Sequence, residues 1–127
     1  ILSAAHQAEY IAKQICYLSE YPKPNTSFVG ELLCIRAKKD INPMFLYSLL
    51  STSIYKTLLN REKRGQTSHL YAQDVRHIRI PIPPINKQNT IAEHIKSLRM
   101  NAKALQADGK AILEDAKRKV EEMIIRE

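Results

Sequence analysis

A short segment in the middle of the chain combines cationic and hydrogen-bonding side chains in a pattern suited to a polyanion. Three cations fall within four positions: Arg61, Lys63 and Arg64. After Gly65 come four polar residues: Gln66, Thr67, Ser68 and His69. Arginine and lysine bind phosphates whatever the base sequence, whereas short polar side chains can also hydrogen-bond to base edges. The segment is therefore a candidate DNA-binding site, and the alternative for each residue is an ordinary solvated turn.

Catalytic arrangements are not evident in the rest of the chain. The four histidines show no metal-ligand spacing: His6, His69, His77 and His94. The carboxylates are mostly isolated or near the C-terminus, so a general acid–base pair has no evident position. No glycine-rich loop is present to cradle a phosphate or S-adenosylmethionine. We therefore expect a non-enzyme without metal or cofactor.

One tetrapeptide, Asn42-Pro43-Met44-Phe45, is similar to the Asn-Pro-Pro-aromatic signature of amino-methyltransferases. In that signature a backbone carbonyl and the asparagine amide hold the target amino group. The second proline is absent here. An asparagine followed by proline is also typical of a helix start, with asparagine as the N-cap and proline in the first turn. We expect the capping role.

The charge of the chain lies mainly in its first two thirds. The 127 residues carry a net charge of +7, of which residues 1–85 hold +5 and residues 86–127 hold +2. A basic chain favours polyanions, although it can also reflect solubility alone. No apolar run reaches the length of a membrane span, and no signal peptide is evident. Cys16 and Cys34 lack CxxC spacing and are expected to be small buried hydrophobic residues in a reducing cytoplasm, the alternative being one disulfide.

The segments before residue 43 predict short strands and loops. Residues 11–18 fit either a helix, because apolar side chains recur at helical spacing, or a compact strand, because they include the β-rich run ICYL. The proline-containing segment 21–27 predicts a loop. The run FVGELLCI, residues 28–35, predicts a buried strand. Because the chain begins with isoleucine, we expect it to be a piece of a longer protein.

Helical spacing then appears in the middle of the chain. Asn42 and Pro43 predict a helix start, and apolar residues on one face extend the helix over 43–61, with an interruption near 51–53. Residues 72–75 predict a short helical turn. The alternating segment HIRIPI that follows it predicts a strand ending at proline.

The chain changes character after a cluster of prolines, Pro81, Pro83 and Pro84, which forbid both a continued ladder and an earlier helix start. A single helix is predicted over 85–127. Apolar residues follow its length in steps of three and four, as in a coiled coil: Ile91, Ile95, Leu98, Ala102, Leu105, Ile112, Ala116 and Met123. Two positions of this seam are interrupted, by Gly109 and Lys119. We expect a small α+β domain over 1–84 and, over 85–127, a helix whose seam needs a partner; the alternative is a helix folded onto its own domain.

The region from Gly30 to Ile95 resembles the target-recognition domain of the DNA-specificity subunit of type I restriction–modification systems. The resemblance follows the helix INPMFLYSLLSTSIYKTLL, the glycine-led loop GQTSHLYAQDV, the run Ile80-Pro81-Ile82-Pro83-Pro84, a glutamine at Gln88 and the long helix. The segment ILSAAHQAEYIAKQICYLSE also resembles the family's preceding strand pair, which favours a strand over a helix at 11–18. The resemblance further implies that the chain is the C-terminal part of such a domain.

Subunits of this family catalyse nothing and read one half of a split DNA target. The resemblance implies that the long helix pairs antiparallel with its counterpart, from a second recognition domain or a second copy, and so spaces the readers. The resemblance also implies that adenine methyltransferase subunits dock on this assembly and that a nuclease–translocase subunit can join them. Two alternatives remain open: a coiled-coil adaptor with a basic head, and the recognition domain of a fused DNA methyltransferase.

Overall fold

The structure, a computed structural model, describes residues 1–127 except for 6–8, 12, 21–22, 63–67 and 126–127. The chain divides into two compact units, Ile1–Ala92 and Glu93–Glu127. We call the first unit the head. It contains a small sheet and several helices, and a long helix, α4 (Ile85–Ile125), begins within it and forms nearly all of the second unit. The predicted α+β class is thereby confirmed.

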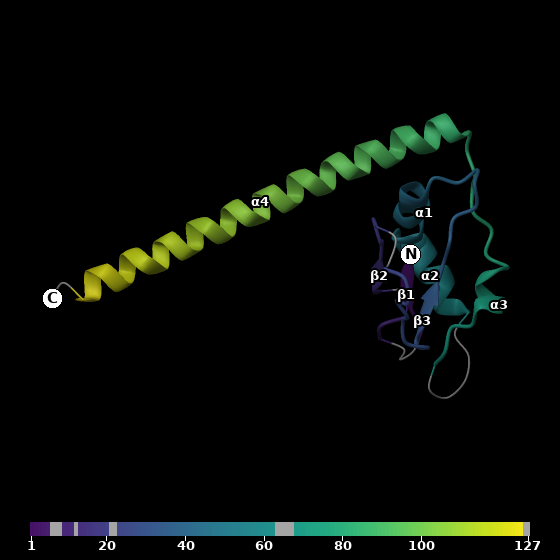
Figure 1. The fold of residues 1–127 in the computed structure, drawn as a ribbon, viewed down its shortest axis with the longest axis horizontal. Helices are drawn as coiled ribbons and strands as arrows, with labels where there is room; N and C mark the ends of the chain where they lie inside the picture. The colour runs from purple at the N-terminus through teal and green to yellow at the C-terminus, as the bar shows by residue number, and fades with distance from the viewer. Residues whose placement is uncertain (6–8, 12, 21–22, 63–67, 126–127) are drawn as a thin grey trace. The chain divides into compact units, whose positions relative to one another are not determined.

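The sheet of the head has three short antiparallel strands in the order β2-β1-β3 (Figure 1). Their bounds are Leu2–Ala4 for β1, Ile15–Cys16 for β2 and Leu32–Cys34 for β3. The strand predicted over 11–18 is therefore two residues long. The strand predicted over 28–35 covers only Leu32–Cys34 in the structure. The N–H of Leu32 donates to the carbonyl of Val29 at 3.1 Å, which closes a turn just before β3.

The register of the sheet explains why the two cysteines are free. Leu2 of β1 pairs with Cys16 of β2 on one side and with Cys34 of β3 on the other. Neighbouring strands lie about 4.8 Å apart, so the two cysteines are separated by roughly twice that distance. A disulfide needs Cα atoms within about 7 Å. Both thiols are free, but the expected burial is wrong, because Cys16 is exposed and Cys34 is only half-buried.

Two consecutive helices, α1 (Pro43–Leu50) and α2 (Ser53–Arg61), lie behind the strands in Figure 1. The side chain of Asn42 caps α1, its Oδ1 accepting hydrogen bonds from the backbone N–H groups of Met44 and Phe45 at 2.9 and 3.1 Å. The break between the helices falls at the predicted position. There the hydroxyl and the backbone N–H of Ser51 both donate to the carbonyl of Tyr47, at 2.8 and 3.0 Å, and close the last turn of α1.

The segment between α2 and α4 contains one helical turn and no sheet strand among its described residues. The turn, α3 (Ala72–Val75), agrees with the prediction. The strand predicted over 77–82 is wrong: these residues do not join the sheet. The carbonyl of Arg79 instead accepts a long, 3.4 Å hydrogen bond from the hydroxyl of Tyr55 on α2. A period-two pattern gives a ladder only where a neighbouring strand edge is available.

The core of the head joins segments that are far apart in the sequence. One of its clusters of buried residues contains Ala5, Ile11, Leu59 and Leu70. Around them pack partly buried residues of the strands and of the segment after α3: Ile15, Leu33, Val75 and Ile78. A backbone hydrogen bond of 2.9 Å from Leu70 to Ala5 adds to this packing. The core thus fixes both ends of the polar segment that lies between Leu59 and Leu70.

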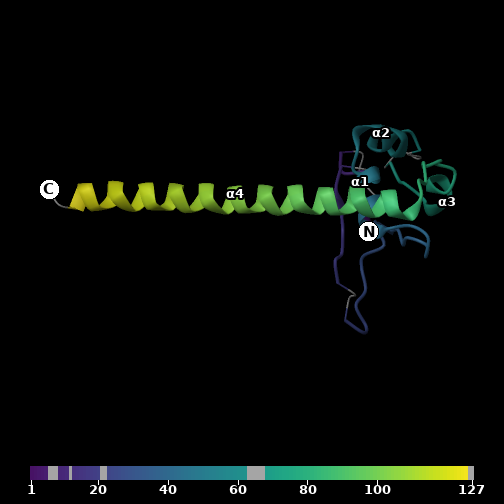
Figure 2. The same ribbon diagram turned by 90° about the horizontal axis from the view of Figure 1, so that it is seen from above.

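Helix α4 is continuous over 41 residues and so is about 60 Å long (Figure 2). Its beginning at Ile85 agrees with the prediction made from the prolines. Gly109 does not break it, and a Cβ built at Gly109 would meet no atom within 4 Å. No described helix is long and apolar enough to cross a membrane.

Candidate nucleic-acid interface

The predicted DNA-binding segment begins at the C-terminal end of α2. Arg61 is the last residue of this helix, and its side chain is exposed. A cation in the last turn complements the negative end of the helix dipole, so the position is favourable for an arginine without any ligand. Lys63, Arg64, Gln66 and Thr67 lie outside the described residues. Arg61, Ser68 and His69 are therefore the predicted site residues whose positions the structure gives.

The segment is held on both sides by the core of the head. Leu59, two residues before Arg61, is 1% exposed, and Leu70, directly after His69, is 3% exposed. Both belong to the same buried cluster. A polar loop whose two ends are fixed by a packed scaffold is a common arrangement for a binding loop, because its anchors do not move when it contacts a ligand.

The end of the loop has an unusual backbone and an aromatic pair. Ser68 has a φ of 48°, in the left-handed region that residues with a Cβ adopt at a cost. The rings of His69 and Tyr71 stack with centroids 5.8 Å apart, and Tyr71 is 49% exposed. Tyr71 was not among the site residues predicted from the sequence. The sequence feature that could have indicated Tyr71 is an aromatic residue two positions after His69, because such a ring can stack on a base or pack on a sugar.

A second group of cations comes together only in the folded head. Arg36, Lys38 and Arg76 line one hollow of about 420 Å³, together with a single carboxylate, Asp40. The rest of its lining is mainly aliphatic, including Ile35, Ile41, Leu46, Leu50, Val75, Ile78, Ile80 and Ile82. Local spacing in the sequence did not predict this group, because Arg36 and Lys38 lie about forty residues from Arg76.

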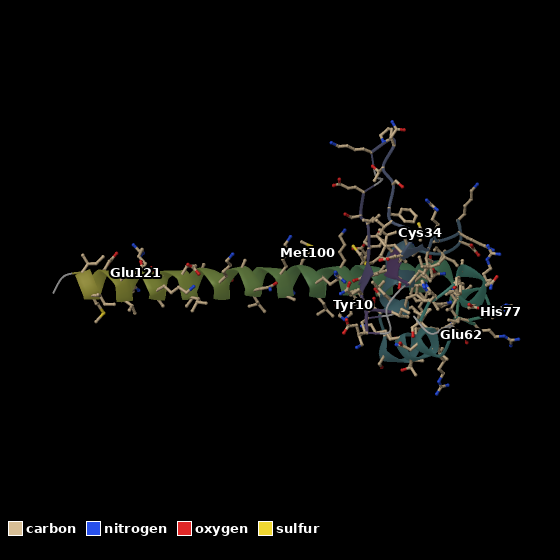
Figure 3. The ribbon with its side chains drawn as sticks, turned by 90° about the horizontal axis from the view of Figure 1, so that it is seen from below. Tyr10, Cys34, Glu62, His77, Met100 and Glu121 are labelled. Atoms are coloured by element: carbon tan, nitrogen blue, oxygen red, sulfur yellow. The ribbon has the colours of Figure 1, made fainter. Side chains whose placement is uncertain are left out.

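Exposed polar residues continue around this part of the head. Figure 3 shows His77, an exposed residue after α3, and Glu62, a half-buried carboxylate at the end of α2 that would repel a phosphate. Arg76 and Arg79 on either side of His77 are also exposed. The described surface near α2 and α3 is therefore rich in cationic and hydrogen-bonding groups, which suits a phosphate backbone.

Two of the chemical sites considered from the sequence, a metal site and an amino-methyltransferase asparagine, can be compared with the residues that the structure describes. No group of three or more histidine, cysteine, aspartate or glutamate side chains could hold a metal ion there. The asparagine of the Asn-Pro-Met-Phe segment is engaged in capping α1, and its Nδ2 donates to Oδ1 of Asn89 at 2.9 Å. The capping of α1 is the structural role that we expected for Asn42.

The start of α4 is tied to the start of α1 by a buried glutamine. Gln88 is 1% exposed. Its Oε1 accepts a hydrogen bond of 2.9 Å from the backbone N–H of Asn42. Its Nε2 donates to the carbonyls of Asp40 at 3.2 Å and Pro83 at 2.8 Å. The glutamine that contributed to the family resemblance is therefore a structural residue whose amide is fully used.

An α+β head with exposed cations, joined to a long helix, is an arrangement suited to recognition of DNA. Residues 14–114 match the family described as Type I restriction modification DNA specificity domain. The match covers most of the chain, and the chain belongs to this family. No curated protein and no solved structure matches. The family assignment supports a role in DNA target recognition.

Proposed function

We propose that the head reads one half of a bipartite DNA target through the segment from Arg61 to His69, while α4 holds this reader at a fixed distance from a second one. The observation that carries the proposal is the family match, which includes most of the head and most of α4. The anchoring of the loop by Leu59 and Leu70 supports its part in reading. Adenine methyltransferase subunits and a nuclease–translocase subunit would supply the chemistry, in the cytoplasm.

The division of labour within the loop follows from the chemistry of its side chains. Arg61, Lys63 and Arg64 supply affinity by neutralising phosphates, a contribution that does not depend on base sequence. The short polar residues Gln66, Thr67, Ser68 and His69 approach base edges and supply discrimination. The exposed ring of Tyr71, stacked on His69, adds a flat apolar surface beside them.

Selection of bound duplexes from a randomised pool tests the reading function. We expect a defined base sequence to be enriched, because base contacts distinguish sequences that phosphate contacts do not. A coiled-coil adaptor with a basic head would instead bind DNA weakly and without sequence preference. Retention of the pool without enrichment, at a salt concentration where binding persists, would therefore contradict the proposal.

The spacer role of α4 rests on its uncovered apolar seam. Leu98 is 50% exposed and Leu105 is 72% exposed, and further seam residues toward the end of the helix are equally uncovered. Burying one large aliphatic side chain contributes about 1.5–3 kcal/mol, so several of them favour a partner helix. We expect the unmodified chain to self-associate in sedimentation, and Leu98→Asp with Leu105→Asp to give a monomer with a folded head. A chain already monomeric at high concentration would count against this role.

A further inference from the structure

Strand β3 leaves one of its edges free in the described part of the head. It pairs with β1 on one side and ends the sheet on the other. The ladder continues at Ile35, whose N–H donates to the carbonyl of Ile1 at 2.8 Å and whose carbonyl accepts from the amino group of Ile1 at 3.0 Å. Because backbone groups of successive residues point to opposite edges, Cys34 and Arg36 direct theirs to the free edge. There they have no hydrogen-bond partner among the described residues.

The proline-rich segment between α3 and α4 also has a free edge. The N–H groups of Ile80 and Ile82 make no hydrogen bond within the part of the chain that the structure describes. The opposite edge is occupied differently, because the carbonyl of Arg79 accepts from Tyr55 of α2, and Pro81 has no N–H to donate. Prolines on one edge and free donors on the other are typical of a strand that pairs on one side.

The two segments border the same hollow, which has a volume of about 420 Å³. Ile78, Ile80 and Ile82 line it, whereas the residues between them do not, and this is the period of an extended chain. After β3, Ile35 and Ala37 are half-buried, and each is followed by an exposed cation. Leucines of α1 complete the aliphatic lining. The hollow is therefore an aliphatic space beside α1 that two extended segments border.

We propose that the hollow receives an extended segment of a partner protein, which pairs with the free edge of β3 and with Ile80 and Ile82. Aliphatic side chains at alternate positions of that segment fill the hollow and cover Leu46 and Leu50 of α1. Extended peptides add to exposed strand edges in this way, with main-chain hydrogen bonds giving affinity and pockets for alternate side chains giving specificity. The alternating run 77–82 then obtains the neighbouring strand that it lacks in the sheet of the head.

The charges around the hollow indicate that the partner segment is acidic. Arg36, Lys38 and Arg76 are exposed and line the hollow, with Asp40 as the one carboxylate beside them. Carboxylates between the aliphatic residues of the partner would complement these cations, and a basic segment would be repelled. DNA also complements the cations, but its sugar–phosphate backbone has no aliphatic side chains to fill the space. The combined lining therefore favours an acidic and aliphatic polypeptide.

A second copy of this chain does not supply such a segment. An alternating acidic and aliphatic strand has carboxylates separated by one residue, and no two carboxylates of the sequence have this spacing. Its acidic pairs, such as Glu121 and Glu122, are adjacent residues within α4. The occupant is therefore a different polypeptide, and its binding does not depend on the reading of DNA by the loop.

Synthetic peptides test the proposal on the unmodified chain. The probe is acetyl-Glu-Val-Glu-Val-Glu-Val-Glu-amide carrying a fluorescent label, and binding is followed by fluorescence anisotropy. We expect saturable binding, and about tenfold weaker binding of the matched peptide with lysine in place of each glutamate, because several exposed ion pairs are lost. Equal binding of the two peptides would overturn the proposal, as would the absence of saturable binding of the acidic one.

Methylation of the peptide backbone tests the strand pairing. N-methyl groups on the valines remove the donors of one edge of the probe, and N-methyl groups on the glutamates remove those of the other edge. Because the proposed strand lies between two edges, each change should weaken binding by about tenfold or more. Laurate, an aliphatic anion without a peptide backbone, should not displace the probe. Unchanged binding of either methylated peptide, or displacement by laurate, would show that the hollow takes amphipathic anions without strand pairing and would overturn the proposal.

Variants of the chain provide matched controls. Ile82→Pro removes a free N–H and should weaken binding of the probe about three- to tenfold, whereas Ile82→Val retains the N–H and should change it by less than about twofold. Ala37→Phe fills the hollow and should abolish binding, with Ala37→Ser as its control. Tyrosine fluorescence in urea checks that each head is folded, and if Ala37→Phe unfolds, the comparison at Ile82 decides. Equal effects within either pair of folded variants would contradict the proposed site.

Discussion

The backbone N–H of Asn42 donates to the side chain of Gln88 across 46 residues of sequence, at 2.9 Å. The same asparagine caps α1, and the same glutamine lies in the first turns of α4. One short network therefore fixes the first turn of α1 and the beginning of α4 within the head. The proline-rich connection also takes part, since the carbonyl of Pro83 accepts from Gln88.

Replacing Gln88 should destabilise the head. Gln88→Leu leaves the N–H of Asn42 and the carbonyls of Asp40 and Pro83 without this partner, and an unpaired buried polar group costs about 1–3 kcal/mol. We expect a loss of about 2–3 kcal/mol in the free energy of unfolding. All six tyrosines precede residue 85, so tyrosine fluorescence in urea reports the head alone. Gln73→Leu, at an exposed position of α3, is the control, and a loss equal to that of the control would contradict the role of Gln88.

Asn42 should be replaceable by aspartate but not by alanine. Asn42→Ala removes the acceptor for the N–H groups of Met44 and Phe45 and should cost about 1 kcal/mol, the usual contribution of an N-cap. Asn42→Asp retains an acceptor at the cap and loses only the exposed hydrogen bond to Asn89, so it should unfold close to the unmodified chain. Urea midpoints followed by tyrosine fluorescence would show the ranking. Equal losses for the two variants would refute the capping explanation.

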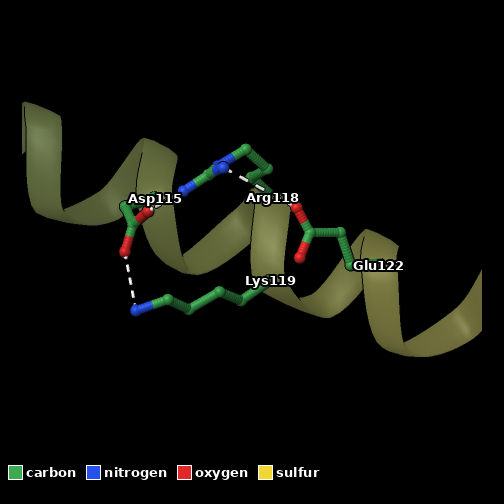
Figure 4. A network of polar contacts seen from close by, with 4 residues as sticks. All are labelled: Asp115, Arg118, Lys119 and Glu122. Atoms are coloured by element: carbon green, nitrogen blue, oxygen red, sulfur yellow. Dashed lines mark hydrogen bonds and ion pairs between the residues drawn. The ribbon is translucent and has the colours of Figure 1, made fainter.

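The stability of the C-terminal part of α4 should depend on the ionisation of Asp115. Hydrogen bonds first from Lys119 and then from Arg118 hold the pKa of Asp115 below its ordinary value of 3.8 (Figure 4). A carboxyl group with a lowered pKa in the folded state stabilises that state fully above its ordinary pKa, and loses this contribution as the pH falls through the lowered value. Helix content measured by circular dichroism should therefore decrease on acidification below about pH 4, and less so in Asp115→Asn. Glu121→Gln, one and a half turns further on, should keep the full decrease.

The cations beside α2 should control the salt dependence of DNA binding. Each phosphate contact that is lost reduces the slope of log affinity against log salt concentration by about 0.9. Arg61→Ala, Lys63→Ala and Arg64→Ala together should weaken binding to all duplexes and flatten the slope by up to about three units. Lys103→Ala, Lys110→Ala and Lys117→Ala on α4 remove the same charge and should have little effect. A second triple variant combines Arg36→Ala, Lys38→Ala and Arg76→Ala. If the salt slope is unchanged in the first triple variant and flattened in the second, the phosphates bind at the hollow and not beside α2.

The polar residues of the loop should act on discrimination rather than on overall affinity. Gln66→Ala or Thr67→Ala removes hydrogen-bonding groups without changing charge. We expect the ratio of affinities between a selected duplex and a scrambled one to fall, while the salt slope remains close to that of the unmodified chain. Competition binding at two salt concentrations measures both quantities. A uniform loss on both duplexes would show that these residues do not contact bases.

Local rules in the sequence were sufficient for the helices. Pro84 followed by a proline-free periodic stretch defined α4, Asn42 and Pro43 defined the start of α1, and the polar residues 51–53 marked the break before α2. In each case the deciding interactions join residues within one or two turns, such as the cap formed by Asn42 on Phe45. A helix satisfies its backbone hydrogen bonds within its own segment, so its ends can be derived from local residue types.

The sheet and the convergent sites were decided by tertiary structure. The alternating run 77–82 does not join the sheet, and β3 is shorter than its apolar pattern, because a strand also requires an edge supplied by distant residues. Gln88 contributed to the family resemblance, but its role depends on the carbonyl of Asp40 and the N–H of Asn42, which are distant in the sequence. Arg36 and Arg76 line one hollow only because the chain returns there after forty residues. Such contacts depend on how the whole chain packs. A local pattern of residues therefore does not indicate which distant residue a side chain will contact.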